Sequence, residues 1–308
     1  MNLNVNKIET FTGHNGAVYA IDSGASDFLF YTSSGDKYVA LWSLKKLQAE
    51  KFAASFPSAI YSLKYVFEKN TIIVGTTEGK IHVIDLNEKK ELKILQNHSA
   101  PVFDIKYSIK TNCFYTTSAD GCIAVCSLEN FSVLKIKKVS NAKIRSIDFS
   151  PVTDEMAVAS GDGKVYVLDL YTLNVKKVFS AHQFSTNSVK FSPDGTLLLT
   201  GGRDAHLNVW STTEDYILFK SIPAHNFAIY DIVFSPDGLL FATASRDKTI
   251  KIWDAITIDF KVRISKENYD GHVNSVNKLL WTTYNKYLVS VSDDRAIMVW
   301  DISANDNL

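Results

Sequence analysis

The chain has 308 residues, of which 46% are hydrophobic and 21% are charged, as expected for a folded globular protein. Its 33 basic and 33 acidic residues give a net charge of zero, which argues against bulk attraction to nucleic-acid phosphates or anionic membranes. No apolar run approaches the roughly 18 residues that span a bilayer, and the N-terminus lacks a secretory-signal pattern. Three sparse cysteines favour free thiols, so we expect a cytoplasmic protein.

The first predicted element is an alternating strand over residues 4–11, and a repeating unit follows it. Each unit contains a strong apolar strand, and we align the units on a residue near the end of that strand, called here the tryptophan column: Trp42, Ile84, Cys126, Leu168, Trp210, Trp253 and Trp300. The steps between these residues are 42, 42, 42, 42, 43 and 47 residues. A period of this length indicates that each repeat is one supersecondary unit.

Three further columns keep register with the tryptophan column. The histidine column lies 28 positions earlier: His14, Phe56, His98, Ser140, His182, His225 and His272. The acid column lies six positions before the tryptophan column: Asp36, Glu78, Asp120, Asp162, Asp204, Asp247 and Asp294. The hydroxyl column lies eight positions before it: Ser34, Thr76, Ser118, Ser160, Gly202, Ser245 and Ser292. All length variation falls in the connector that leads to the next histidine column, so every unit has a fixed core.

The sixth unit shows the strands of a repeat most plainly. Its predicted strands occupy residues 229–234, 239–244, 249–253 and, in the variable connector, about 259–264. Ser235-Pro236-Asp237-Gly238 separates the first two strands, where proline presets φ and glycine allows a positive φ. No segment carries a sustained 3.6-residue apolar period with caps, so we expect almost no helix.

These patterns resemble the WD-repeat family, which combines a period near 42 with Gly-His early and Trp-Asp late in each repeat. The matching dipeptides are Gly13-His14, Gly271-His272, Trp253-Asp254 and Trp300-Asp301, with Trp42-Ser43 and Trp210-Ser211 as near matches. The resemblance covers the whole chain and implies an all-β, seven-bladed β-propeller with four antiparallel strands per blade, forming a single domain over residues 1–308. Blades two and four depart from the family at both the histidine and the tryptophan columns.

The resemblance also implies how the ring closes. Only eight residues follow Trp300, so blade seven lacks an outer strand at the C-terminus. We expect the strand over residues 4–11 to complete that blade, because an unpaired sheet edge is prone to fraying and aggregation.

Recurring His, Ser and Asp residues suggest a hydrolase triad, but a catalytic set is needed once and this set is complete in blades one, six and seven. The family resemblance implies instead a buried structural network in each blade, in which the acid bonds the histidine, the histidine bonds the hydroxyl, and the hydroxyl bonds the indole N–H. The residues assigned to these networks are His14, Ser34, Asp36, Trp42, His98, Ser118, Asp120, His182, Asp204, Trp210, His225, Ser245, Asp247, Trp253, His272, Ser292, Asp294 and Trp300. We expect no catalytic residue, no metal site and no cofactor.

In propellers of this family, partners commonly dock at the channel mouth, where the inner strands begin. Residues three and five positions after the histidine column, and the residue before the acid column, map to that face. The candidate partner-binding residues are Tyr19, Tyr61, Phe103, Lys143, Arg145, Asn187, Arg203, Tyr230, Arg246 and Asn277. Blades one to three contribute an aromatic half and blades four to six a basic half, residue types enriched at interfaces. The alternative is that these are ordinary strand residues packed at the mouth.

The leading functional hypothesis is a non-enzymatic scaffold, monomeric on its own, that binds a protein or peptide carrying acidic and apolar residues, without a membrane role. One alternative is a nucleic-acid-associated complex subunit that uses the basic half, which the zero net charge disfavours. Another is a ligand-binder or enzyme with a site in the channel, which would need titratable groups there. The mouth columns contain few acids, so we expect few along the channel.

Overall fold

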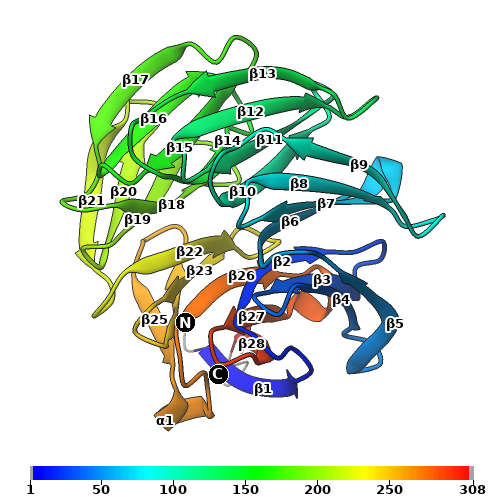
Figure 1. Cartoon of the computed structure of the whole chain (residues 1–308). Coiled ribbons are helices and arrows are strands. Elements are labelled where there is room, and N and C mark those ends of the chain that lie inside the picture. Colours follow the sequence, from blue (N-terminus) through cyan, green and yellow to red (C-terminus); the bar gives the residue numbers. More distant parts are fainter. Residues whose placement is uncertain (1–2, 305–308) are drawn as a thin grey trace.

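A computed structural model describes residues Leu3–Ala304 and shows seven four-stranded antiparallel sheets set around a central axis (Figure 1). The sheets follow one another along the chain, and each holds one sequence repeat. The predicted all-β, seven-bladed propeller is therefore confirmed. Blade one is the sheet that contains Trp42, and blade seven is the sheet that contains Trp300.

Each blade presents one strand to the channel and a second strand behind it. The inner strands of blades one to seven are β2 (Val18–Ser23), β6 (Ile60–Val66), β10 (Val102–Ser108), β14 (Ile144–Phe149), β18 (Thr186–Phe191), β22 (Ile229–Phe234) and β26 (Val276–Trp281). The second strands are β3 (Leu29–Ser34), β7 (Thr71–Thr76), β11 (Cys113–Ser118), β15 (Glu155–Ser160), β19 (Leu197–Gly202), β23 (Leu240–Ser245) and β27 (Leu288–Ser292). The second strands are almost entirely buried, which explains their continuous apolar and hydroxyl character.

The third and fourth strands complete each blade toward the rim. The third strands are β4 (Tyr38–Ser43), β8 (Lys80–Asp85), β12 (Cys122–Ser127), β16 (Lys164–Asp169), β20 (His206–Ser211), β24 (Ile250–Asp254) and β28 (Ile297–Ala304). The outer strands are β5 (Gln48–Ser55), β9 (Lys90–Gln96), β13 (Val133–Lys138), β17 (Val175–Ser180), β21 (Ile217–Pro223), β25 (Phe260–Ile264) and, for blade seven, β1 (Leu3–Phe11).

Helix is confined to short turns, as predicted. The longest connector holds α1 (Lys266–Tyr269), and two 3-10 turns, η1 (Phe67–Lys69) and η2 (Tyr284–Lys286), join inner to second strands. Within Leu3–Ala304, no helix is both long enough and apolar enough to cross a membrane.

The hydrophobic core lies between blades rather than within them. Seven clusters of buried side chains each join two neighbouring blades. Between blades seven and one, for example, Phe30 and Trp42 pack with Val289 and Val299. Because each apolar face is covered only by the next blade, the ring must be complete for the core to be buried.

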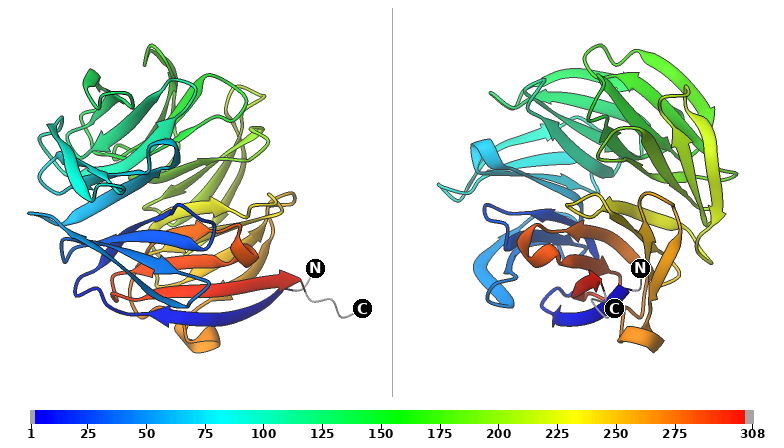
Figure 2. Two further views of the ribbon diagram at one scale, coloured as in Figure 1. Left: turned by 90° about the vertical axis from the view of Figure 1, so that its right-hand side faces the viewer. Right: turned by 180° about the vertical axis from the view of Figure 1, so that it is seen from behind.

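Strand β1 closes the ring by pairing antiparallel with β28, from Leu3 opposite Ala304 to Phe11 opposite Ile297. Figure 2 shows these two strands, coloured blue and red, side by side. Val5 and Phe11 are both buried, so the N-terminal strand contributes to the core as well as to the sheet. The predicted closure of blade seven by residues 4–11 is confirmed, with the strand beginning one residue earlier.

Candidate functional site

The recurring polar residues form a hydrogen-bonded chain inside each complete blade. In blade one, His14 Nδ1 lies 2.9 Å from an Asp36 carboxylate oxygen, and His14 Nε2 lies 2.9 Å from the Thr32 hydroxyl. Trp42 Nε1 donates to that same Thr32 hydroxyl at 2.7 Å. A neutral imidazole with its proton on Nδ1 satisfies every group: indole N–H to hydroxyl, hydroxyl to Nε2, and Nδ1–H to carboxylate.

The bridging hydroxyl is not the one predicted from sequence. Ser34, Ser118, Ser245 and Ser292 were assigned to bridge histidine and tryptophan, and the structure contradicts this. The bridging residue lies two positions earlier, on the same face of the second strand and at the depth of the indole: Thr32, Thr116, Thr200, Thr243 or Ser290. The predicted serines instead accept the backbone N–H of the acid-column residue at 3.0–3.1 Å and so fix the turn.

The histidine–acid contact is present in blades one, three, five, six and seven. The distances from Nδ1 to the carboxylate lie between 2.8 and 3.0 Å, for His14–Asp36, His98–Asp120, His182–Asp204, His225–Asp247 and His272–Asp294. An indole N–H completes the chain in blades one, five, six and seven. In blade three, Cys126 occupies the tryptophan position and its Sγ accepts from Asn97 at 3.1 Å. Burial lowers the pKa of His98 and of His225, in keeping with neutral imidazoles.

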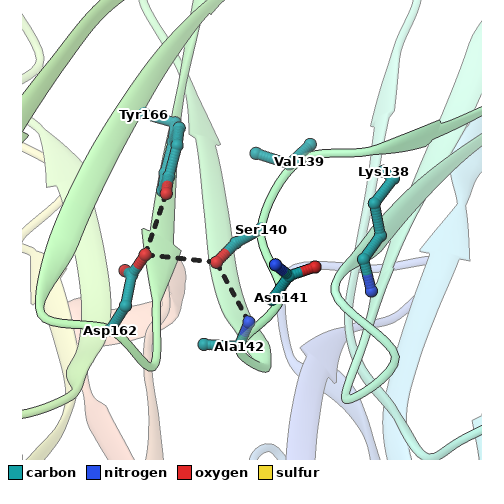
Figure 3. Close-up of a pocket in the computed structure, with 7 residues that line it drawn as sticks. All are labelled: Lys138, Val139, Ser140, Asn141, Ala142, Asp162 and Tyr166. Atoms are coloured by element: carbon teal, nitrogen blue, oxygen red, sulfur yellow. Dashed lines mark hydrogen bonds between the residues drawn. The ribbon is translucent and has the colours of Figure 1, made fainter.

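Blades two and four lack the column histidine and each carry a ring on the third strand near its place. In blade four, Tyr166 on β16 donates its hydroxyl to Asp162 at 2.8 Å, and Ser140 donates to the same carboxylate at 3.2 Å (Figure 3). In blade two, His82 lies at the position equivalent to Tyr166, and its ring meets the edge of Phe56 with centroids 5.2 Å apart. Both rings lie two positions before the tryptophan column, but only Tyr166 takes over the bond to the acid-column residue. His82 Nδ1 bonds Glu91 instead, and His82 Nε2 is buried without a partner among the residues described.

A repeated β-bulge aims the candidate partner-binding residues at the channel mouth. In every blade the register between the inner and second strands skips one residue, which lies five positions after the histidine column. A bulge frees a residue from the ladder and redirects its side chain. The seven skipped residues are Tyr19, Tyr61, Phe103, Arg145, Asn187, Tyr230 and Asn277.

All ten candidate residues line one cavity at the mouth, with a volume of about 880 Å³. Backbone hydrogen bonds hold the rim of this cavity. In every blade, the residue just before the acid column donates its N–H to the carbonyl of the residue three positions after the histidine column, as Arg203 does to Ser185 and Arg246 to Ala228. Five cations line this cavity, against the single carboxylate of Asp293. The cavity is therefore open, mixed in character and positively charged.

The aromatic half of the mouth is a packed row of rings. Tyr19 and Tyr61 meet edge-on with centroids 4.6 Å apart, and Tyr61 stacks on Phe103 at 5.9 Å. The Arg145 guanidinium continues the row, lying 5.0 Å from the Phe103 centroid. Such contacts hold these half-buried rings in place before any partner arrives.

The basic half lacks counter-charges. Within the described part of the chain, Lys143, Arg145, Arg203 and Arg246 form no ion pair within 4.0 Å, and Arg145 Nε is buried without a hydrogen-bond partner. Burial lowers the pKa of Arg145, and the nearby charge of Arg203 lowers it further. A bound anion would relieve the repulsion between these cations.

Two candidate residues also have a structural role. Asn187 Nδ2 donates to Ile229 O of the next blade at 3.1 Å, and Asn277 Nδ2 donates to Val18 O at 2.9 Å. They belong to a set of side-chain-to-backbone bonds that crosses every blade interface around the channel. The full set is Asp22 with Tyr65 N, Ser62 with Val102 O, Asp104 with Ile147 N, Asp148 with Phe191 N, Asn187 with Ile229 O, Asp231 with Leu279 N, and Asn277 with Val18 O.

The channel below the mouth is rich in charge, which corrects the expectation of few acids there. Four aspartates and four lysines gather around it: Asp22, Asp104, Asp148, Asp231, Lys64, Lys106, Lys190 and Lys278. Burial lowers the pKa of Lys106, but Asp104 and Asp148 outweigh it, so the net shift is upward. The mouth columns could not reveal this ring, because its members lie deeper on the inner strands.

Curated relatives match a short part of the chain. Eukaryotic translation initiation factor 3 subunit I from Aspergillus oryzae is 28% identical over 89 residues, which is 27% of this chain and 26% of the relative. The same subunit from Emericella nidulans matches with the same identity and extent. The matched segment thus spans about a quarter of the length of these relatives.

The WD40 family, described as WD domain, G-beta repeat, matches the chain at residues 5–43, 89–127, 173–211, 217–254 and 263–301. The two long unmatched stretches, 44–88 and 128–172, hold the first three strands of blades two and four, which lack the column histidine and tryptophan but keep the fold. The matched residues make up more than half of the sequence. They include the hydrogen-bonded chains of histidine, hydroxyl and acid described above. The chain belongs to the WD40 repeat family.

Proposed function

We propose that this propeller is a non-enzymatic, cytoplasmic scaffold whose mouth cavity binds a protein or peptide segment carrying acidic and apolar residues. The observation that carries the proposal is the cavity of about 880 Å³, where bulges aim aromatic side chains from blades one to three and Arg145 from blade four, and where Lys143, Arg203 and Arg246 add further cations. Half-buried aromatic rings beside exposed arginine side chains, in a preformed hollow, suit a protein partner.

The channel supports a scaffold rather than a channel enzyme. The cavity inside it has a volume of only about 210 Å³, and its aspartates and lysines pair with one another. Charges that are already matched offer little to a substrate. The relatives are named as a subunit of a translation initiation factor, which fits a chain that works within a larger assembly.

Charge reversal at the mouth tests the proposal. We expect affinity capture from the native cell to recover the same specific partner with wild type and with a Lys51→Glu/Lys69→Glu control, whose exposed lysines lie outside the cavity lining. The Arg203→Glu/Arg246→Glu variant should lose that partner. Equal recovery by all three proteins would show that the mouth is not the binding site.

The nucleic-acid alternative predicts a different result. Binding through the basic half would release counterions, so affinity for single-stranded nucleic acid should fall steeply as salt rises. We expect weak binding that does not compete with the captured protein partner. Tight, salt-dependent binding abolished by Arg203→Glu/Arg246→Glu would favour the alternative.

A further inference from the structure

Two exposed phenylalanines extend the basic half beyond the cavity. Two positions after the histidine column the blades carry Gly16, Ser58, Ala100, Ala142, Phe184, Phe227 and Asn274. The two large apolar residues, Phe184 and Phe227, are 53% and 56% exposed, and they fall on the blades that carry Arg203 and Arg246. Exposed aromatic rings on one side of a docking cavity suggest a continuing contact surface.

Phe227 contacts the arginine of its blade, and Phe184 lies near the backbone of Arg203. The Arg246 guanidinium lies 5.9 Å from the centroid of the Phe227 ring. Arg203 N donates to the carbonyl of Ser185 at 2.8 Å, which places Arg203 beside the residue that follows Phe184. Blades five and six therefore present alternating cationic and apolar groups that lead outward from the mouth.

A hollow of about 520 Å³ lies beside Phe184 in blade five, and Gln183, His206 and Asn208 also line it. Asn208 is only 7% exposed, and its Nδ2 donates to Ala181 O at 2.6 Å. Its Oδ1 has no hydrogen-bond partner among the residues described. The fold therefore leaves a polar group beside this hollow unsatisfied.

The equivalent hollow of blade four has a different lining. Ala142 stands where blade five has Phe184, and Tyr166 stands where it has Asn208. There Tyr166 and Ser140 both bond Asp162, so these polar groups satisfy one another (Figure 3). The blade-five hollow differs from it in having both an exposed ring and an unpartnered acceptor.

We infer that the partner is an extended acidic segment that leaves the mouth across blades five and six. Its carboxylates bind Arg203 and Arg246, and an apolar side chain packs on Phe184 and Phe227. The inference rests on the proposed function, since it requires the segment to begin at the mouth. Charge complementarity identifies this occupant, because the surface carries uncompensated cations and exposed rings side by side.

Fluorescence polarisation with labelled peptides tests the path. The probe alternates glutamate with leucine, and the comparison peptides replace leucine with serine or glutamate with lysine. Wild type should bind the glutamate–leucine peptide most tightly. Phe184→Ala/Phe227→Ala should weaken that binding about tenfold, to the level of the glutamate–serine peptide. The control Phe67→Ala, an exposed ring on η1, should bind like wild type, and thermal melts should show that all variants are folded.

The outcomes separate the two proposals. If Arg203→Glu/Arg246→Glu abolishes binding while Phe184→Ala/Phe227→Ala binds like wild type, the path over blades five and six is wrong and the mouth remains the site. If wild type binds the glutamate–leucine peptide no more tightly than the two comparison peptides, both proposals fail. Loss of binding in both variants, with the Phe67→Ala control unaffected, supports the path.

Discussion

At the scale of single residues, the position of a hydroxyl decides which groups inside a blade are satisfied. Thr243 accepts from Trp253 and bonds His225, whereas Ser245 bonds the backbone of the turn. The sequence contains the signal for this difference, because the column ten positions before tryptophan holds Val74 and Val158 in the two blades without histidine. Where the ring and the indole are absent, the hydroxyl is absent too.

Thr243→Val tests that assignment with almost no change in shape. The variant leaves the indole N–H and His225 Nε2 without a partner, so we expect the free energy of unfolding to fall by about 2 kcal/mol. Ser245→Ala is the matched control and should cost about 1 kcal/mol or less, because it removes bonds at the partly exposed turn. Urea denaturation measures both. A larger loss for Ser245→Ala would restore the original assignment.

Acid should weaken the protein in two stages. Burial lowers the pKa of His98 and His225, so below about pH 6.5 the unfolded chain binds more protons and the melting temperature should fall from about pH 7 to 5.

The second stage belongs to Asp204. Burial would raise the pKa of Asp204, but the His182 hydrogen bond and charge lower it from 3.8 to about 2. Its contribution, roughly 2 kcal/mol, is present above pH 3.8 and disappears as the pH falls toward 2.

The Asp204→Asn variant separates these stages in melts recorded across pH. It should keep the loss of stability between about pH 7 and 5, which comes from the histidines of blades three and six. Its additional loss between about pH 4 and 2 should be smaller than that of wild type. If the variant and wild type lose the same stability between about pH 4 and 2, Asp204 does not contribute in this range.

At the scale of strands, side chains that reach one repeat ahead fasten each blade to the next. Around the channel, aspartate, serine and asparagine side chains bond the following inner strand. At the rim, lysines of the outer strands bond carbonyls of the following blade: Lys93 to Asn130, Lys135 to Thr172, Lys177 to Asp215 and Lys220 to Thr257. Lysines on outer strands also discourage edge-to-edge pairing with other chains.

Asp148 is the most connected of the inner ties. Its carboxylate accepts from Phe191 N at 3.0 Å and Lys190 Nζ at 3.1 Å, with Lys106 Nζ at 3.7 Å. Asp148→Ala leaves two channel lysines unpaired, so we expect a loss of about 3 kcal/mol in urea denaturation. Asp154→Ala, which removes an exposed partner of Lys110, should cost less than about 1 kcal/mol. Equal losses for the two variants would contradict the role of the inner ties.

At the scale of the whole molecule, the fold follows from the sequence because the repeat places the same groups at the same depth seven times. Spacing aligned the turn acids with the histidines, and the resemblance to the WD-repeat family then indicated their pairing, the closure of the ring and the residues of the mouth. The inter-blade ties could not, since Asp22 and Tyr65 lie a full repeat apart and share no column. Phe184 and Asn208 were missed because they depart from their columns rather than define them.

Closure of the ring is the property of the whole chain that a truncation tests most directly. Deleting residues 1–11 exposes the edge of β28 and removes the buried side chains of Val5 and Phe11, each worth roughly 2 kcal/mol. We expect the melting temperature to fall by about 10 °C or more. A synthetic peptide of residues 1–11 should restore much of that loss and a scrambled peptide should not, because only the native order returns both side chains to the core. A truncated chain that melts with the intact one would show that closure by β1 is not needed.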